Sequence, residues 1–245
     1  MIRGRDPLNA QLLYQAGRLD EAVQALGSAL RADPADVRSR TFLFELLCFA
    51  GEYDRAAKQL DIIADGSKEA GLGAMLYRSA LHAERTRQDL FQTVGRVEGA
   101  QPSTAVAGTL NGQPFTFLSD ADPRIGARLE VFAAGQYTWV PFEHLAEVHV
   151  EVPKRLRDLL WAPTRVRAGP GFKDFEFGEV VVPAIAPLSC LHADWQVRLG
   201  REVDWQVLAD GAEVPLGPKM LQVDEELVPI LEVRELIIRP ADPHD

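Results

Sequence analysis

The chain has 245 residues, of which 47% are hydrophobic and 25% charged, values that are ordinary for a globular protein of one or two domains. Its formal net charge of −10 lies mostly beyond residue 99, because residues 1–99 hold 13 basic and 14 acidic side chains and residues 100–245 hold 13 and 22. So acidic a surface repels phosphate groups, and we therefore expect no nucleic-acid partner and no membrane partner.

The N-terminus carries no secretory signal, and the longest dense apolar run, residues 42–50, is far shorter than the ~20 residues that span a bilayer. We therefore predict a cytoplasmic protein. The two cysteines, Cys48 and Cys190, have no Cys-x-x-Cys partner, which argues against a disulfide framework and a zinc ribbon. Cys48 lies in an apolar run and is predicted to be a buried thiol.

The first third of the chain repeats itself with a period of 34 residues, the period of tetratricopeptide (TPR) repeats. Positions of the first unit that recur in the second are Leu12, Leu13, Gly17, Leu19, Asp20, Ala22 and Leu26, which map onto Leu46, Leu47, Gly51, Tyr53, Asp54, Ala56 and Leu60. A degraded third unit is predicted over residues 70–96. We therefore predict an all-α TPR-like array over residues 1–99.

The repeated residue types suit helical hairpins. Gly17 and Gly51 are predicted to end the first helix of each pair in the left-handed conformation, and Pro34 to end a second helix. The small residues Ala22 and Ala56 let the two helices of a hairpin approach closely. Each hairpin buries its apolar face only against its neighbours, so about three units are needed for stability.

Arrays of this kind bind a peptide or a helix on the face formed by the first helix of each pair. Projection of the usual groove positions through the 34-residue register gives eight candidate partner-binding residues. They are Gln11, Tyr14, Arg38, Thr41, Glu45, Met75, Ser79 and His82. The alternative for each residue is a solvated helix face.

Turn residues interrupt the helical pattern at 99–103, and alternating strand-like segments follow. The fold class predicted for the whole chain is α+β, with the helical array followed by a small domain over residues 104–245 that is rich in antiparallel strands. A helix is expected from Asp122 through Phe132, and short helices at 142–145 and 153–160. Strands are expected over the following ranges: 113–117, 136–140, 147–152, 175–182, 205–208 and 231–238.

Several ordered motifs of the second part resemble the ImpE/TagJ family, also called SciE-type virulence proteins. The motifs are Asn111-Gly112-x-Pro114-Phe115, Asp120-Ala121-Asp122-x-Arg124-x-Gly126, Tyr137-x-Trp139-Val140-Pro141-Phe142-Glu143, residues 155–161 and residues 231–236. The resemblance covers residues 8–238, with departures at 169–171 and 184–195. It implies an accessory role in bacterial type VI secretion, whose contractile sheath assembles in the cytoplasm.

The resemblance further implies binding to the small sheath subunit through its N-terminal helix. It links the protein to sheath assembly, or indirectly to sheath recycling by the AAA+ unfoldase. A helical-repeat groove suits an amphipathic helix. The leading hypothesis is therefore a non-catalytic adaptor without a cofactor.

Two rival functions remain open. A small-molecule enzyme or binder would use the carboxylates Asp120 and Asp122 with Arg124, although a strand end, a helix cap and a turn-holding ion pair explain these residues as well. A general TPR co-chaperone would need several basic residues in the groove, where the projection gives only Arg38.

No metal site is predicted. Cys190, His192 and Asp194 could share one face of a strand, but no second cluster completes a tetrahedral set, and His144 and His149 fit no zinc motif. All four tryptophans, Trp139, Trp161, Trp195 and Trp205, fall in the second part and are interpreted as core residues. Exposure of one of them would indicate an interface.

Overall fold

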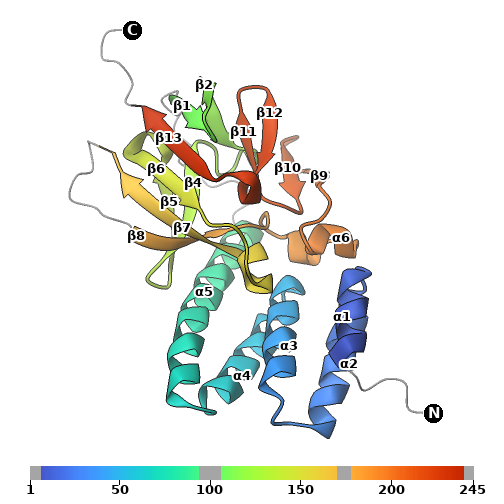
Figure 1. Cartoon of the computed structure of the whole chain (residues 1–245). Coiled ribbons are helices and arrows are strands. Elements are labelled where there is room, and N and C mark those ends of the chain that lie inside the picture. Colours follow the sequence, from blue (N-terminus) through green and yellow to red (C-terminus); the bar gives the residue numbers. More distant parts are fainter. Residues whose placement is uncertain (1–6, 94–105, 170–177, 240–245) are drawn as a thin grey trace.

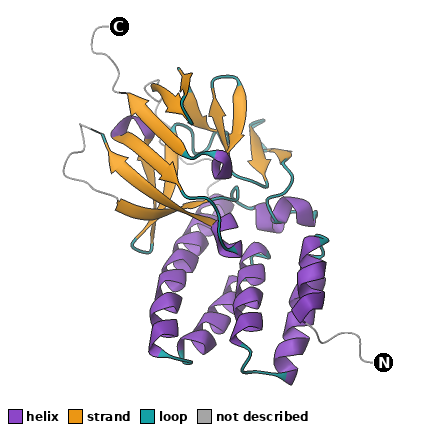
Figure 2. Cartoon of the chain, viewed as in Figure 1, coloured by secondary structure: helices purple, strands orange, loops and turns teal. Residues whose placement is uncertain are grey.

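The structure, a computed structural model, describes residues 7–93, 106–169 and 178–239 (Figure 1). The described helices before residue 94 form an array at one end of the molecule, and strands fill the other end (Figure 2). The helices of the array are α1 (Pro7–Gln15), α2 (Leu19–Ala32), α3 (Val37–Phe49), α4 (Tyr53–Ala64) and α5 (Lys68–Thr93). The predicted fold class, a TPR-like array followed by a strand-rich α+β region, is confirmed.

Glycine ends the first helix of both hairpins, as the repeat predicts. Gly17 and Gly51 have φ values of +75° and +72°, which an L side chain rarely adopts. The amides that follow them, of Arg18 and Glu52, donate across the helix end to the carbonyls of Leu13 and Leu47 at 2.8 and 2.9 Å. This bonding pattern is the Schellman motif, which satisfies carbonyls that the helix itself leaves free.

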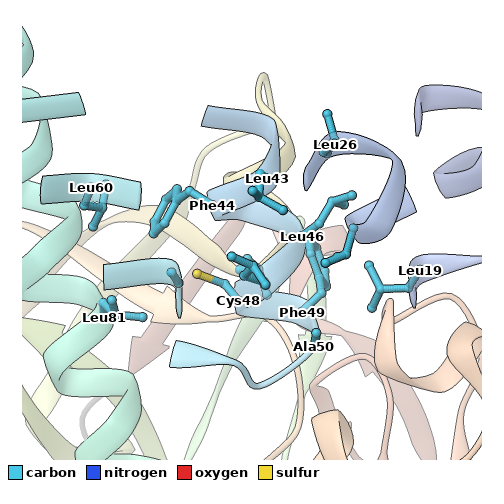
Figure 3. Packing of buried hydrophobic residues seen from close by; sticks show 14 of the residues in the cluster. Leu19, Leu26, Leu43, Phe44, Leu46, Cys48, Phe49, Ala50, Leu60 and Leu81 are labelled. Carbon is cyan, nitrogen blue, oxygen red and sulfur yellow. The ribbon is translucent and has the colours of Figure 1, made fainter. Parts of the chain in front are cut away.

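The third repeat unit differs from the prediction. Residues 68–93 form one continuous helix of 26 residues, α5, and no second helix of that unit follows it among the described residues. The sheet takes the place of the missing helix, because Phe132 and Trp161 belong to the same hydrophobic core as the helical array. Figure 3 shows the centre of that core, where side chains of α2, α3, α4 and α5 meet around Phe44 and Phe49. Cys48 is buried there, as predicted.

The strand-rich part is built on an eight-stranded antiparallel sheet with the order β2-β1-β13-β6-β7-β8-β4-β5. Its strands are β1 (Ala107–Leu110), β2 (Gln113–Phe115), β4 (Arg128–Ala133), β5 (Gln136–Pro141), β6 (Leu145–Val150), β7 (Trp161–Ala168), β8 (Gly178–Pro183) and β13 (Glu235–Arg239). Three more strands form a second sheet: β3 (Leu118–Asp120), β11 (Met220–Val223) and β12 (Glu226–Pro229).

A two-stranded hairpin and several short helical turns complete the described chain. The hairpin consists of β9 (Asp204–Val207) and β10 (Glu213–Leu216). The turns are η1 (Phe142–His144), η2 (Leu156–Leu159), η4 (Ser189–Leu191), α6 (Trp195–Arg198) and η5 (Ile230–Glu232). Most expected strands lie within two or three residues of an observed one, although residues 175–177 of one prediction lie outside the described part.

The expected helix from Asp122 to Phe132 is wrong. Residues 128–133 form β4, which pairs with β5 through a tight turn at 134–135. Asp122 does begin a hydrogen-bonded turn, since its carbonyl accepts from the amides of Ile125 and Gly126. The turn stops there because Gly126 takes a φ of +65° and Leu129 and Val131 are then buried in the sheet core.

A fully buried group of charges joins α5 to the sheet. Arg87 donates to Glu130 of β4 at 2.7 and 3.0 Å and also lies 3.2 Å from Glu84, one turn earlier on α5. Lys219 contacts both Glu130 and Asp120. Because each of these five side chains is less than a tenth exposed, each charge depends on its partners for compensation.

Candidate protein-binding site

The predicted groove residues lie on α1, α3 and α5, the first helices of the three units. A hollow of about 810 Å³ opens between α1 and α3. Ten residues line it: Leu8, Gln11, Tyr14, Asp36, Arg38, Ser39, Thr41, Phe42, Glu45 and Leu156. The structure thus brings five of the eight predicted residues into one concave site, here called the array groove.

The walls of the array groove are aromatic and fixed in place. Tyr14 and Phe42 meet edge to face with their ring centroids 6.0 Å apart. Behind them, Arg201 stacks over the Tyr14 ring at 4.7 Å and donates to the carbonyls of Tyr14 and Gln15 at the end of α1. The Tyr14 carbonyl also accepts from the amide of Gly17 at 3.0 Å, so Arg201 adds a second donor there and places a cation at the negative end of the α1 dipole. The strand-rich part therefore holds α1, and with it one wall of the groove, in position.

Glu45 places a buried carboxyl group in the groove. Burial raises its pKa from 4.5 to about 7, because desolvation disfavours the ionised form more strongly than the nearby Arg157 favours it. The Arg157 guanidinium lies 3.8 Å from the Glu45 carboxylate, a loose ion pair. A cationic or hydrogen-bonding group of a partner could satisfy this carboxyl group better than Arg157 does.

The turn η2 closes one end of the groove, and the repeat pattern gave no sign of this. Leu156 lines the groove, while the Arg157 guanidinium stacks over the Tyr77 ring of α5 at 4.1 Å. Asp158 fixes the turn by accepting from the amides of Lys154 and Arg155 at 2.8 and 2.9 Å. The sequence predicts a short helix at residues 153–160, but the contact of this turn with helices about a hundred residues earlier depends on the tertiary fold.

The three predicted residues of α5 lie apart from the array groove. Ser79 lines a second hollow of about 620 Å³ between α5, η2 and strands β4, β7 and β8, and the turn residue Gly135 lies close to it. Met75 and His82 share its helical stripe and are exposed, Met75 to 65%. The rim beside Met75 is apolar, because Leu76 and Val152 are 73% and 56% exposed. The second hollow could therefore also receive apolar side chains of a partner.

One buried polar atom without a partner lies at the second hollow. The Nε of Arg157, whose side chain lines that hollow, donates no hydrogen bond among the described residues. A buried polar group without a partner costs about 1–3 kcal/mol. The hydroxyl of Ser39 in the array groove instead faces the carboxylate of Asp36 and lowers the pKa of that group.

The carboxylates proposed for small-molecule chemistry have structural partners. Asp122 holds the guanidinium of Arg124, as one interpretation predicted, at 2.6 to 3.1 Å. Asp120 accepts from the amide of Asp122 at 2.9 Å and pairs with Lys219. Neither the array groove nor the second hollow is lined by these residues. Their geometry is that of a braced turn beside the buried charge group.

Two of the residues considered as metal ligands, His192 and Asp194, also form hydrogen bonds within the protein. His192 bonds Asp204 at 3.0 Å, and Asp194 caps α6 by accepting from the amide of Gln196. A different trio, Glu147, His149 and Glu235 on neighbouring strands β6 and β13, brings its ligand atoms within 4.8 Å of one another. Glu147 is already paired with Arg167 at 2.7 Å.

Among the described helices, none is long and apolar enough to cross a membrane. Among the described residues that line the array groove, Arg38 is the one basic residue, whereas a co-chaperone of this type needs a cluster of cations. The chemistry of the groove is instead apolar and aromatic, with Asp36 and Glu45 as acidic groups. Such a lining has room for apolar and aromatic side chains of a partner.

Comparison with known proteins agrees with this geometry. The model of the ImpE protein family matches residues 112–237, and a tetratricopeptide-repeat model matches residues 13–72. The type VI secretion system accessory component TagJ of Pseudomonas aeruginosa is 30% identical over 98% of this chain and 95% of its own. The chain belongs to the ImpE family. The resemblance found in the sequence is thereby confirmed.

A solved structure shares this fold. The crystal structure of VPA1032 from Vibrio parahaemolyticus superposes with a TM-score of 0.83 and 24% identity over 94% of this chain and 97% of that one. This likeness concerns the fold alone. It spans both the helical array and the strand-rich part, so this ImpE chain and VPA1032 share their arrangement almost from end to end.

Proposed function

We propose that this ImpE protein is a cytoplasmic, non-catalytic adaptor of type VI secretion whose array groove binds the N-terminal helix of the small sheath subunit. The observation that carries the proposal is the concave, largely apolar groove between α1 and α3. Support comes from membership of the family and from the relative that is named as a type VI secretion accessory component. Through this contact the protein would assist sheath assembly, or indirectly sheath recycling by the AAA+ unfoldase.

The size of the groove suits a helix. An α-helix with side chains is about 10 Å across and rises 5.4 Å per turn, so one turn occupies about 420 Å³. The groove volume of about 810 Å³ therefore corresponds to roughly two turns. Two turns present apolar side chains at i, i+3, i+4 and i+7, the spacing with which amphipathic helices enter grooves.

The experiment is a pull-down of the full chain against the sheath subunits of its own organism, followed by calorimetry with the N-terminal helix of the subunit that binds. Tyr14→Ala and Arg38→Ala should each weaken binding about tenfold, since one removes an aromatic wall and the other removes the basic side chain found among the described lining residues. Lys58→Ala, an exposed change on α4 outside the groove, is the matched control. Unchanged affinity in both groove variants would place the contact elsewhere, and no binding to any sheath subunit would refute the proposal.

A second contact in the strand-rich part is testable in the same assay. Truncation after residue 99 is unsuitable, because it would expose the face of α5 that packs against Phe132 and Trp161. Ser79→Arg instead fills the second hollow in the full chain. If that variant binds as tightly as the unmodified protein, the sheath helix contacts the array groove alone.

A further inference from the structure

The hairpin β9–β10 exposes an apolar stripe on an open strand edge. Val203, Trp205 and Val207 alternate along the chain and are 39%, 41% and 63% exposed. Because strand side chains alternate between faces, the three lie on the same side of the hairpin. Of the four tryptophans predicted to be core residues, Trp161 is buried, Trp139 and Trp195 are half-buried, and Trp205 is exposed.

The outer edge of β9 is free to accept another strand. β9 pairs with β10 on one side, in register from Asp204 opposite Leu216 to Val207 opposite Glu213. No other described strand pairs with its second side. In an antiparallel pair about half of the backbone groups of an edge strand point away from the partner. On β9 the amide of Trp205 donates to its neighbour's carboxylate, Asp204, at 2.9 Å, so an added strand would have to displace that local bond while the other outward groups accept it directly.

The base of the hairpin is firmly anchored, so the edge is presented in a fixed orientation. Gly217 lets β10 approach the start of β9 so closely that a Cβ there would lie 2.1 Å from the carbonyl oxygen of Glu202. Arg201, just before β9, bonds the end of α1, and Asp204 bonds His192 at 3.0 Å. Figure 1 shows the hairpin above α6, away from the middle of the large sheet.

The charged side chains of the hairpin itself are all acidic, although Arg201 directly precedes it and is bound to the end of α1. Residues 202–214 contain four acidic side chains and no lysine or arginine. Glu202, Asp210 and Glu213 are exposed and make no ion pair among the described residues. Two copies of this edge would place like charges side by side, which is destabilising. The area that these three side chains could bury is also far below the roughly 1,200–2,000 Å² of a stable interface between copies.

We infer that the edge of β9 binds an extended, basic segment of a partner protein by strand addition. The segment would pair its backbone with β9, place apolar residues at alternate positions against Val203, Trp205 and Val207, and direct lysine or arginine side chains to the surrounding carboxylates. This site is separate from the array groove. It would give the adaptor a contact that does not depend on the sheath-helix proposal.

The test uses the full chain and a labelled peptide of alternating lysine and valine, about nine residues long, titrated by fluorescence anisotropy. Binding should be saturable, should weaken with added salt, and should fail for a glutamate–valine peptide and for a lysine–valine peptide interrupted by proline. Hydrogen exchange of the backbone amides of residues 203–207 should slow on binding, which locates the site.

Variants of the chain test whether the lysine–valine peptide binds the edge of β9 or is attracted nonspecifically by the acidic surface. Trp205→Ser should weaken the lysine–valine peptide about tenfold, whereas Leu191→Ser, an exposed leucine that lies outside β9, should not. The double change Asp210→Lys and Glu213→Lys, in and after the hairpin turn, should shift preference toward the glutamate–valine peptide. Equal binding of both peptides to the unmodified chain would overturn the proposal. So would unchanged exchange at 203–207, or a dimer of the chain that Trp205→Ser dissociates.

Discussion

Replacement of Glu130 by glutamine should destabilise the protein more than any single surface change. Glu130 is completely buried and accepts hydrogen bonds from Arg87 at 2.7 and 3.0 Å, from the Tyr137 hydroxyl at 2.6 Å and from Lys219. Both cations lower the pKa of this carboxyl group far below its ordinary value, so it is ionised at neutral pH. Glutamine keeps the shape but removes the charge and turns an amide donor toward other donors.

The expected size follows from the burial of the partners. Breaking a buried ion pair costs about 3–5 kcal/mol, because the remaining charge stays desolvated without compensation. In a chain of 245 residues each kcal/mol lowers Tm by about 2–4 °C, so Glu130→Gln should lower Tm by about 6–20 °C. Calorimetry and urea unfolding at neutral pH measure both quantities.

The matched control is Asp54→Asn. Asp54 also forms an ion pair, with Arg85 at 2.5 Å, but its side chain is 90% exposed. Solvent screens that pair to at most about 1 kcal/mol, so its loss should move Tm by no more than about 4 °C. A Tm for Glu130→Gln within the same margin would refute the view that the buried charges hold α5 against the sheet.

Two further predictions concern the array itself. Gly51→Ala should be destabilising, because Gly51 has a φ of +72° and a Cβ there would lie 3.0 Å from the Cys190 sulfur. Gly73→Ala should instead stabilise the protein by about 0.5–1 kcal/mol, because Gly73 lies within α5 and a Cβ there would meet no atom within 4 Å. Equal effects of the two variants on the free energy of unfolding in urea would contradict this. The raised pKa of Glu45 means that the folded state binds its proton more tightly, so its contribution is present below pH 4.5 and lost as pH rises through about 7. The free energy of unfolding should therefore fall by up to about 3 kcal/mol over that range, and Glu45→Gln should remove that slope; a variant with the unmodified slope would exclude Glu45 as its source.

The sequence determined the helical array and much of its groove. A 34-residue period is a local property, and Gly17 and Gly51 carry their left-handed backbone wherever the chain folds. The register of that period also determines which side chains of α1 and α3 share a face, so the sequence alone places Tyr14, Arg38 and Glu45 together.

The prediction failed where local preference competed with the sheet. Residues 122–132 start with an aspartate followed by a proline, a helix-start signal. Residues 128–133 nevertheless form β4, because Leu129 and Val131 are buried in the hydrophobic core of the sheet. Likewise, the third repeat lost its second helix because the sheet already covers α5. Tertiary burial outweighed propensity in both cases.

Only the tertiary structure could reveal the contacts between distant residues. Glu130 and Lys219 are 89 positions apart, and Arg157 reaches Glu45 across more than a hundred residues. No spacing rule links such positions, since their pairing depends on how two separately patterned parts dock. The exposure of Trp205 belongs to the same class: strand alternation puts Val203, Trp205 and Val207 on one side, but only packing decides whether that side is covered.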